Sequence, residues 1–238
     1  MATTLRLGSI TVDVVQKDIK NVHLSVYPPA GKVRISAPLR MKLDTIRVFA
    51  VSKLAWIKEQ QQKITSQERE TQRSYSERES HYLWGKRYLL NAVEEDSPPG
   101  IELRHNRIVF RVRPKWSSQR KQEFLDAWYR AELKKAVPEL LAKWEPVIGV
   151  KVDHVFVQRM RTKWGSCSRN SPAIRLNTDL AKKPPECLEY IVVHEMAHLI
   201  EPTHSNRFIA LMDRLMPKWR FYRQLLNRLP VRHEEWAY

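Results

Sequence analysis

The sequence predicts an α+β protein with a β-rich first part and a helix-rich second part. Before about residue 113, short runs of β-branched residues alternate with turn signals such as PPAG and SPPG. From Ser117 onward, apolar residues recur at helical spacing. We therefore divide the chain into a β-rich N-terminal part with one helix, residues 1–115, and a second part, residues 116–238. We expect the two parts to form one integrated unit.

In the first part, the strands before residue 38 are expected to form a small antiparallel sheet, and one amphipathic helix is expected after it. The helix is expected at 42–64, where Ile46, Phe49 and Leu54 lie close to helical spacing. The following stretch, 65–80, is almost wholly polar and charged, which predicts a solvated linker. The strands are expected at 9–15, 22–27, 32–37, 82–90, 101–104 and 107–113.

In the second part, a long helix is expected at 118–144, with Pro138 kinking or splitting it. A strand at 150–157 follows, and then a basic loop, RMRTKWGSCSRNSP, and a short strand at 173–177. The remaining helices are expected at about 184–200, 205–215 and 218–228.

Composition narrows the classes of function. The 42 Lys and Arg residues exceed the 26 Asp and Glu residues, and the resulting charge of +16 favours a polyanionic partner. No two glycines are spaced G-x-G, which argues against dinucleotide-binding loops. Only Cys167 and Cys187 are present, which suits a reducing compartment. No apolar run has the length of a membrane helix and no signal peptide is evident, so we expect a cytoplasmic protein without a membrane partner.

The segment His194-Glu195-Met196-Ala197-His198 carries the clearest chemical signal. Residues four apart share one face of a helix, so both imidazoles can reach one zinc ion, and the intervening Glu can act on water there. Catalytic zinc takes three protein ligands. His204 and Glu201 are the candidates for the third, and Pro202 favours His204 because it disfavours helical geometry at Glu201.

These residues carry a resemblance to a known family. HEMAHLIEPTHSNRF, preceded by KWGSCS and AIRLNTDL, resembles the YgjP-like zinc metallopeptidases, relatives of the SprT-type and Wss1-type proteases. The similarity extends upstream through SAPLRMKLDTIRVFAVSKLAWI and LWGKRYLL, so it covers most of the chain. Metzincins share the histidine spacing but place Gly where this chain has Glu201, and no Met-turn is evident.

The resemblance implies a gluzincin-like metallopeptidase core, in which an active-site helix lies against a small mixed sheet with an edge strand facing the cleft. It implies one Zn²⁺ per chain, held by His194, His198 and His204, with Glu195 as the general base. Residues near the motif are candidates for substrate binding: Trp164, Gly165, Arg175 and Asn177. The oxyanion stabiliser is not identified, with candidates Arg161, Arg175, Asn177 and Tyr190. We expect a strand such as 173–177 to pair with an extended peptide, and Cys167 to pack beside the cleft and not to act as a nucleophile.

Positive charge is concentrated in residues 104–163, which hold fifteen Lys or Arg and six acidic residues. With Trp116 among them, six of these cations form a candidate nucleic-acid-binding patch: Arg107, Arg111, Arg113, Lys115, Arg120 and Lys121. The alternative is a solvated face.

The sequence favours a zinc-dependent metallopeptidase that acts on protein or peptide substrates, including nucleic-acid-associated proteins. The alternatives are a zinc-dependent phosphohydrolase acting on nucleoside triphosphates and a metal-bearing nucleic-acid-binding module. An edge strand along the cleft would favour peptide, whereas Arg and Lys converging on the metal would favour phosphate.

Overall fold

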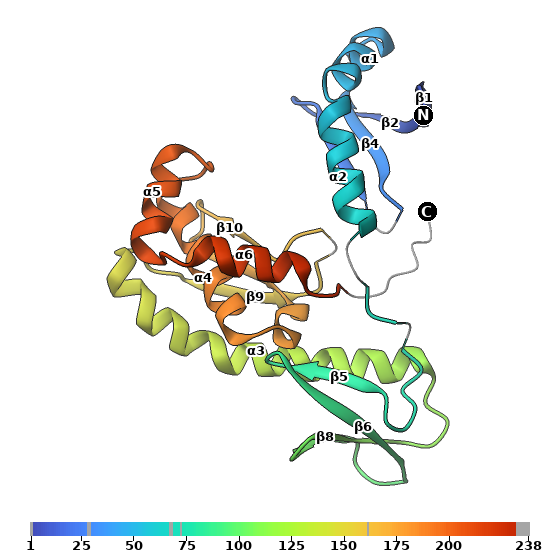
Figure 1. The fold of residues 1–238 in the computed structure, drawn as a ribbon, viewed down its shortest axis with the longest axis vertical. Coiled ribbons are helices and arrows are strands. Elements are labelled where there is room, and N and C mark those ends of the chain that lie inside the picture. The colour runs from blue at the N-terminus through green and yellow to red at the C-terminus, as the bar shows by residue number, and fades with distance from the viewer. Residues whose placement is uncertain (1, 28–29, 67–68, 72, 161, 232–238) are drawn as a thin grey trace. The chain divides into compact units, whose positions relative to one another are not determined.

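The computed structural model describes residues 2–27, 30–66, 69–71, 73–160 and 162–231, and it confirms the mixed α+β class (Figure 1). The described part of the chain divides into two compact units, an N-terminal unit up to Glu70 and a C-terminal unit from Thr71 to Val231. Each unit has its own hydrophobic core. The boundary therefore falls in the polar linker and not at residue 115, because the strands just before residue 115 pack on the long helix that follows them.

The N-terminal unit is a four-stranded sheet covered by two helices. The strand order is β1-β2-β4-β3, and the β2–β4 pair is parallel, so the sheet is not purely antiparallel as expected. The single helix expected at 42–64 is divided at Lys53, whose φ of −105° and ψ of 6° end the first helix. The elements are β1 Ala2–Leu7, β2 Ile10–Lys17, β3 His23–Tyr27, β4 Lys32–Pro38, α1 Leu43–Ser52 and α2 Leu54–Ser66.

A second four-stranded sheet opens the C-terminal unit, in the order β5-β6-β8-β7. The strand expected at 82–90 is instead a hairpin, because Trp84 and Gly85 both adopt positive φ angles, 50° and 77°, and reverse the chain. The backbone N–H of Trp84 donates to the Ala181 carbonyl at 2.7 Å, which ties this turn to the segment before the helix that carries His194. The strands are β5 Ser80–Leu83, β6 Lys86–Glu94, β7 Gly100–Arg104 and β8 Arg107–Val112.

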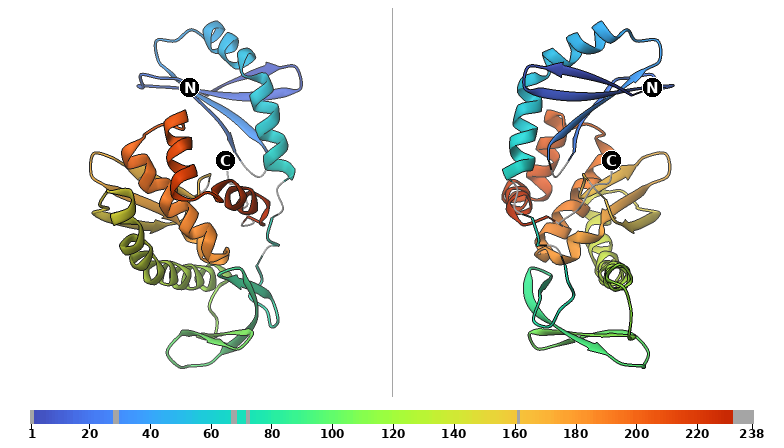
Figure 2. Two further views of the ribbon diagram at one scale, coloured as in Figure 1. Left: turned by 60° about the vertical axis from the view of Figure 1, so that its left-hand side comes forward. Right: turned by 90° about the vertical axis from the view of Figure 1, so that its right-hand side faces the viewer.

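The long helix α3, Ser118–Ile148, runs between this sheet and the rest of the C-terminal unit (Figures 1 and 2). It begins at Ser117, whose side chain accepts from the Arg120 N–H, and ends at Gly149 in the left-handed conformation. The helix passes through Pro138 without a break, so the expected split is wrong. Buried side chains on both sides of Pro138 hold the adjoining turns in place and offset the lost hydrogen bond.

The remaining elements form the part of the unit that carries the candidate site. The three-stranded sheet has the order β10-β11-β9, with β10 and β11 antiparallel and β11 and β9 parallel. Strand β10, inside the expected basic loop, was not predicted. The elements are β9 His154–Gln158, β10 Gly165–Ser168, β11 Ala173–Asn177, a 3-10 helix η1 Thr178–Lys182, α4 Pro185–Ile200, α5 Asn206–Leu215 and α6 Trp219–Arg228.

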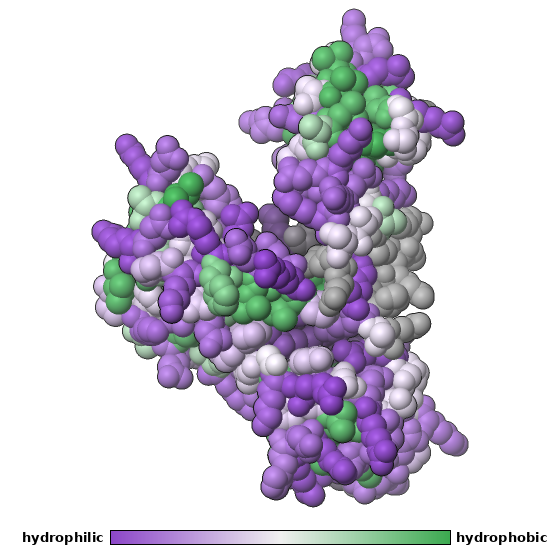
Figure 3. Space-filling model, in the orientation of Figure 1, coloured by the Kyte–Doolittle hydropathy of each residue, from purple (hydrophilic) through white to green (hydrophobic). Residues whose placement is uncertain are grey.

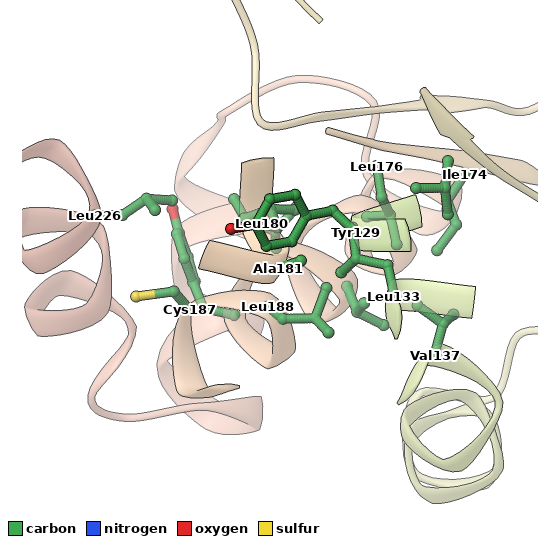
Figure 4. Packing of buried hydrophobic residues seen from close by; sticks show 14 of the residues in the cluster. Tyr129, Leu133, Val137, Ile174, Leu176, Leu180, Ala181, Cys187, Leu188 and Leu226 are labelled. Atoms are coloured by element: carbon green, nitrogen blue, oxygen red, sulfur yellow. The ribbon is translucent and has the colours of Figure 1, made fainter. Parts of the chain in front are cut away.

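The core of the C-terminal unit joins α3, β11, η1 and α4 (Figure 4). Tyr129 and Leu133 of α3 lie beside Leu176 of β11 and Leu180 of η1, all less than 2 % exposed. Burying such side chains contributes roughly 1.5–3 kcal/mol each. This packing fixes the position of α4, the helix that carries the histidines, relative to the sheet.

A buried polar cluster lies at the start of β5. The Nε2 atom of His81, which is 1 % exposed, lies 2.8 Å from Oε1 of Glu79. The other carboxylate oxygen of Glu79 accepts from the backbone N–H groups of Ser74 and Tyr75, both at 2.8 Å. Burial favours the neutral acid, but the hydrogen bonds from His81 and Ser74 outweigh it and lower the pKa of Glu79 to about 2.

Hydrophilic side chains cover most of the visible surface, with hydrophobic side chains gathered over α1 and near α6 (Figure 3). Val48 of α1 and Phe221 of α6 are among the exposed apolar residues. No helix in the described part of the chain is long and apolar enough to span a bilayer.

Candidate active site

Helix α4 presents His194, Glu195 and His198 together at its C-terminal end. The helix begins with Pro185 in its first turn, where the missing N–H costs no hydrogen bond. It ends at Glu201, whose extended backbone (φ −118°, ψ 102°) turns the chain away from the helix axis. The two histidines are one turn apart, and their ring centroids lie 4.7 Å from each other.

The turn after α4 brings His204 back to these two histidines. The nearest ring nitrogens of His194, His198 and His204 all lie within 4.8 Å of one another, and Nε2 of His204 is 3.2 Å from Nε2 of His194. Ser205 then caps α5 by accepting from the Phe208 N–H at 3.3 Å, which fixes the residue that follows His204. The Glu201 side chain does not belong to this group of three.

The surroundings of the three histidines favour metal binding through their ring nitrogens. Nδ1 of His198 lies 3.0 Å from the Glu201 carbonyl oxygen, an acceptor, so Nδ1 carries the proton and Nε2 is free to bind a metal. Burial, with the nearby charges of His198, His204 and Arg223, lowers the pKa of His194 to about 3. Burial and the charges of His198 and Arg223 lower the pKa of His204. Three imidazoles form a donor set that fits zinc.

The buried ring of Phe208 of α5 contacts all three histidine rings. Its ring stacks on His198 at a centroid distance of 4.5 Å and meets the rings of His194 and His204 edge-on, each at 5.0 Å. The side chain is 1 % exposed, so it is held by packing on every side. Phe208 therefore restricts the orientation of all three rings, a role that the sequence analysis did not assign to it.

Glu195 lies against strand β10, and Gly165 makes this approach possible. A Cβ atom on Gly165 would lie 2.6 Å from Oε1 of Glu195 and 2.9 Å from both Cγ of Glu195 and Cγ2 of Ile191. Any side chain at Gly165 would therefore overlap the candidate general base. Burial raises the pKa of Glu195 to about 7, against the opposing effect of the Lys163 charge.

Strand β10 is an edge of its sheet, with β11 as its only neighbour among the described strands. The Trp164 carbonyl accepts from the Asn177 N–H at 2.9 Å, and antiparallel pairing alternates from there. The main-chain groups of Gly165 and Cys167 consequently point away from β11, toward the open edge. Residues 173–177 form the central strand β11 and have no free edge, so the expectation that they pair with a peptide is wrong.

Two predicted substrate-binding residues, Arg175 and Asn177, contact other parts of the chain and not the histidines. Ile174 and Leu176 are buried in the core, so Arg175 lies on the opposite face of the sheet, where its guanidinium stands 5.3 Å from the Phe156 ring centroid. Asn177 is buried, and its Nδ2 donates to the carbonyls of Met160 and Lys163 at 2.8 and 2.9 Å. Asn177 thus positions the loop before β10.

The other candidates border the site differently. Trp164 is half-buried, with Nζ of Lys183 5.8 Å from its ring centroid. Tyr190 meets the ring of His194 edge-on at 5.7 Å, and burial raises its pKa to about 12. Burial and the Glu195 charge raise the pKa of Cys167, so its thiol stays protonated, which disfavours a thiol nucleophile. Arg161 lies outside the described residues.

The basic patch lies on the outer face of β8 and the segment leading into α3. Half of its six cations are paired: Arg111 with Glu102 at 3.5 Å, Arg120 with Glu123 at 3.5 Å, and Lys121 with Glu94 at 2.7 Å. The exposed side chains of Arg107, Arg113 and Lys115 have no carboxylate partner in the described part of the chain. Trp116 is half-buried and packs edge-on against Phe124 at 5.4 Å, so it is not a free stacking platform.

The chain was compared with solved structures, curated protein sequences and protein-family models. Two solved structures are similar to part of the chain: the metallopeptidase zymogens abylysin of Pyrococcus abyssi and jannalysin of Methanocaldococcus jannaschii, each 21% identical. The match covers 41% of this chain and 99% of abylysin, with a TM-score of 0.36, and 40% of this chain and 92% of jannalysin, with a TM-score of 0.33. No match was found among curated protein sequences. The family model described as "YgjP-like, metallopeptidase domain" matches residues 20–229, and the chain therefore belongs to the YgjP-like metallopeptidase family.

Proposed function

We propose that this metallopeptidase-family protein is a zinc-dependent endopeptidase whose metal is held by His194, His198 and His204. The observation that carries the proposal is the grouping of three histidine nitrogens within 4.8 Å, next to a buried glutamate that touches an open strand edge. Three imidazoles leave one position of a tetrahedral zinc site for the reacting group. Family membership supports a metal ion and peptide substrates, and the donor set supports zinc.

In the proposed mechanism, each residue has a definite task. Bound zinc would supply a Lewis acid that polarises the scissile carbonyl. The Glu195 carboxylate would take a proton from the attacking water and return it to the nitrogen of the leaving amine. The outward-facing main-chain groups of Gly165 and Cys167 would hydrogen-bond the backbone of an extended substrate beside Glu195.

Binding of nucleic acid by the basic patch is a second part of the proposal. Three exposed cations without a carboxylate partner among the described residues support it: Arg107, Arg113 and Lys115. Contacts of this kind are made to phosphates and contribute affinity without sequence preference. Nucleic acid bound here would bring proteins associated with it close to the enzyme.

The experiment that tests the proposed activity compares zinc-loaded wild-type protein with Glu195→Gln. Both are incubated with unfolded proteins and, separately, with nucleoside triphosphates. The variant keeps the size of the side chain and removes its ability to accept a proton, so it should bind zinc but lose peptide hydrolysis. Equal peptide hydrolysis by the variant would remove Glu195 as the base. Consumption of nucleoside triphosphates alone would replace the peptidase with the phosphohydrolase.

A further inference from the structure

A cation on α6 borders the candidate active site from the histidine side. Trp219 of α6 stacks on Tyr190, with ring centroids 6.4 Å apart, and Tyr190 in turn meets His194 edge-on. Arg223 lies one turn beyond Trp219 on the same face of α6, and is exposed. Its charge is near enough to help lower the pKa values of His194 and His204. No carboxylate partner of Arg223 is found among the described residues.

A second cation borders the site from the Glu195 side. Lys163 is exposed and lies two residues before Gly165, the residue in contact with Glu195. The Asn177 side chain holds the Lys163 carbonyl at 2.9 Å, which fixes the backbone at this position. Like Arg223, Lys163 has no ion-pair partner in the part of the chain that the structure describes. Lys163 and Arg223 thus bring positive charge to two sides of the site.

We propose that Lys163 and Arg223 form two anion subsites, one on each side of the catalytic residues, and that the preferred substrates are peptides with carboxylate side chains near the scissile bond. This inference rests on the proposed function. An unpaired cation beside a binding site favours an opposite charge on the ligand and raises the association rate of acidic substrates. Arginine is suited to this task because its planar guanidinium can hold a carboxylate by two parallel hydrogen bonds.

Peptide carboxylates fit the arrangement better than a chain of phosphates does. The two cations lie on different elements. Lys163 precedes β10, which lies against Glu195, whereas Arg223 lies on α6, which packs beside His194 through Trp219 and Tyr190. A triphosphate site usually adds a glycine-rich loop of backbone N–H groups, and this chain has no G-x-G sequence. The open edge of β10 lies on the Lys163 side and offers main-chain hydrogen bonds that a peptide can use.

The test uses two internally quenched peptides that differ only in having Glu or Gln at the positions flanking the scissile bond. For the zinc-loaded full chain we expect kcat/KM to be roughly tenfold higher for the Glu peptide. Arg223→Gln and Lys163→Gln should each reduce this ratio several-fold, and Arg223→Lys should retain part of it. Arg228→Gln, an exposed arginine later on α6, and Lys151→Gln are the matched controls and should keep the wild-type ratio.

Binding separates this inference from the proposed activity. Each peptide is prepared with a fluorescent label and no quencher, and fluorescence anisotropy measures its affinity. The two zinc-loaded proteins compared are Glu195→Gln and the double variant Glu195→Gln/Arg223→Gln. Tighter binding of the Glu peptide that depends on Arg223 supports the anion subsites even if the wild type cleaves no peptide. Equal affinities for both peptides overturn them even if both are cleaved. A loss in Arg223→Gln of equal size for both peptides also overturns them, as does a preference for a nucleoside triphosphate over the Glu peptide in competition.

Discussion

Replacing Gly165 with alanine tests the contact between β10 and the candidate general base. The added Cβ would lie 2.6 Å from Oε1 of Glu195, about 0.8 Å inside the 3.4 Å at which ordinary contact begins, and 2.9 Å from Cγ2 of Ile191. Ile191 is buried in α4, so neither that helix nor the paired strand has room to yield. Overpacking of this kind costs about 1–3 kcal/mol. Displacing a catalytic group by about 1 Å lowers turnover by about a hundredfold.

Urea unfolding gives the change in stability, and hydrolysis of a quenched peptide gives kcat. We expect Gly165→Ala to lose 1–3 kcal/mol of stability and about two orders of magnitude in kcat while still binding zinc. Gly100→Ala is the control, because its nearest neighbour would be the flexible end of Arg111 at 3.4 Å. In a Glu195→Ala background the stability loss from Gly165→Ala should shrink. Wild-type stability and turnover in Gly165→Ala would refute the close contact.

Three further predictions concern the surroundings of the site. Phe208→Ala should destabilise the protein by about 3–5 kcal/mol and weaken zinc binding, whereas Phe208→Leu should retain most of the stability and of the zinc affinity. Urea unfolding measures the stability and zinc titration measures the affinity. Unchanged zinc affinity in Phe208→Ala would contradict the role of the ring. Because the pKa of Glu79 falls from 4.5 to about 2 on folding, its contribution to stability, roughly 3 kcal/mol, is present above pH 4.5 and is lost as the pH falls toward 2. Glu79→Gln should therefore flatten the dependence of unfolding free energy on pH over this interval, and an unchanged slope would exclude Glu79 as its cause. Replacing Arg107, Arg113 and Lys115 with Gln should reduce the slope of log K for single-stranded DNA against log salt concentration by about 0.7 per lost contact. Arg104→Gln is the control, because Arg104 already pairs with Glu102. An unchanged slope in the triple variant would show that the patch does not bind DNA.

The sequence predicts the active-site helix well because its signals are local. Pro185 marks a helix start, the apolar residues keep helical spacing, and Pro202 ends the helical geometry before Glu201. These features also favoured His204 over Glu201, and the structure brings His204 and not the Glu201 carboxylate to the other histidines. Strand β11 was likewise predicted with its observed bounds, from a short apolar run between polar stretches.

Other features depend on distant partners and leave little trace in the local pattern. The four residues of β10, GSCS, have no β-branched or alternating apolar signal, and pairing with β11 makes them a strand. The segment YLWGKRYLL was predicted as one strand and is a hairpin. Tryptophan rarely adopts a positive φ, so the residue type at position 84 does not indicate the turn. The division between the two units could not be read from the change in pattern at residue 115, because it depends on β8 packing against α3.

The roles of Phe208 and Arg223 were missed for a related reason. Both lie on helices with strong apolar periodicity, where one aromatic or one arginine looks like an ordinary core or surface residue. Their importance comes from α5 and α6 being packed against α4. Conversely, the sequence suggested Arg175, which the alternation of β11 directs away from α4.

Metal content is the decisive measurement for the histidine site. Purified, zinc-equilibrated protein is analysed by inductively coupled plasma mass spectrometry beside His204→Ala, His198→Ala and, as a control, His105→Ala, an exposed histidine in the β7–β8 turn. We predict about one zinc per wild-type and His105→Ala chain, and a large loss of zinc in the other two variants. Wild-type protein without zinc, or His204→Ala with a full equivalent, would contradict the three-histidine site.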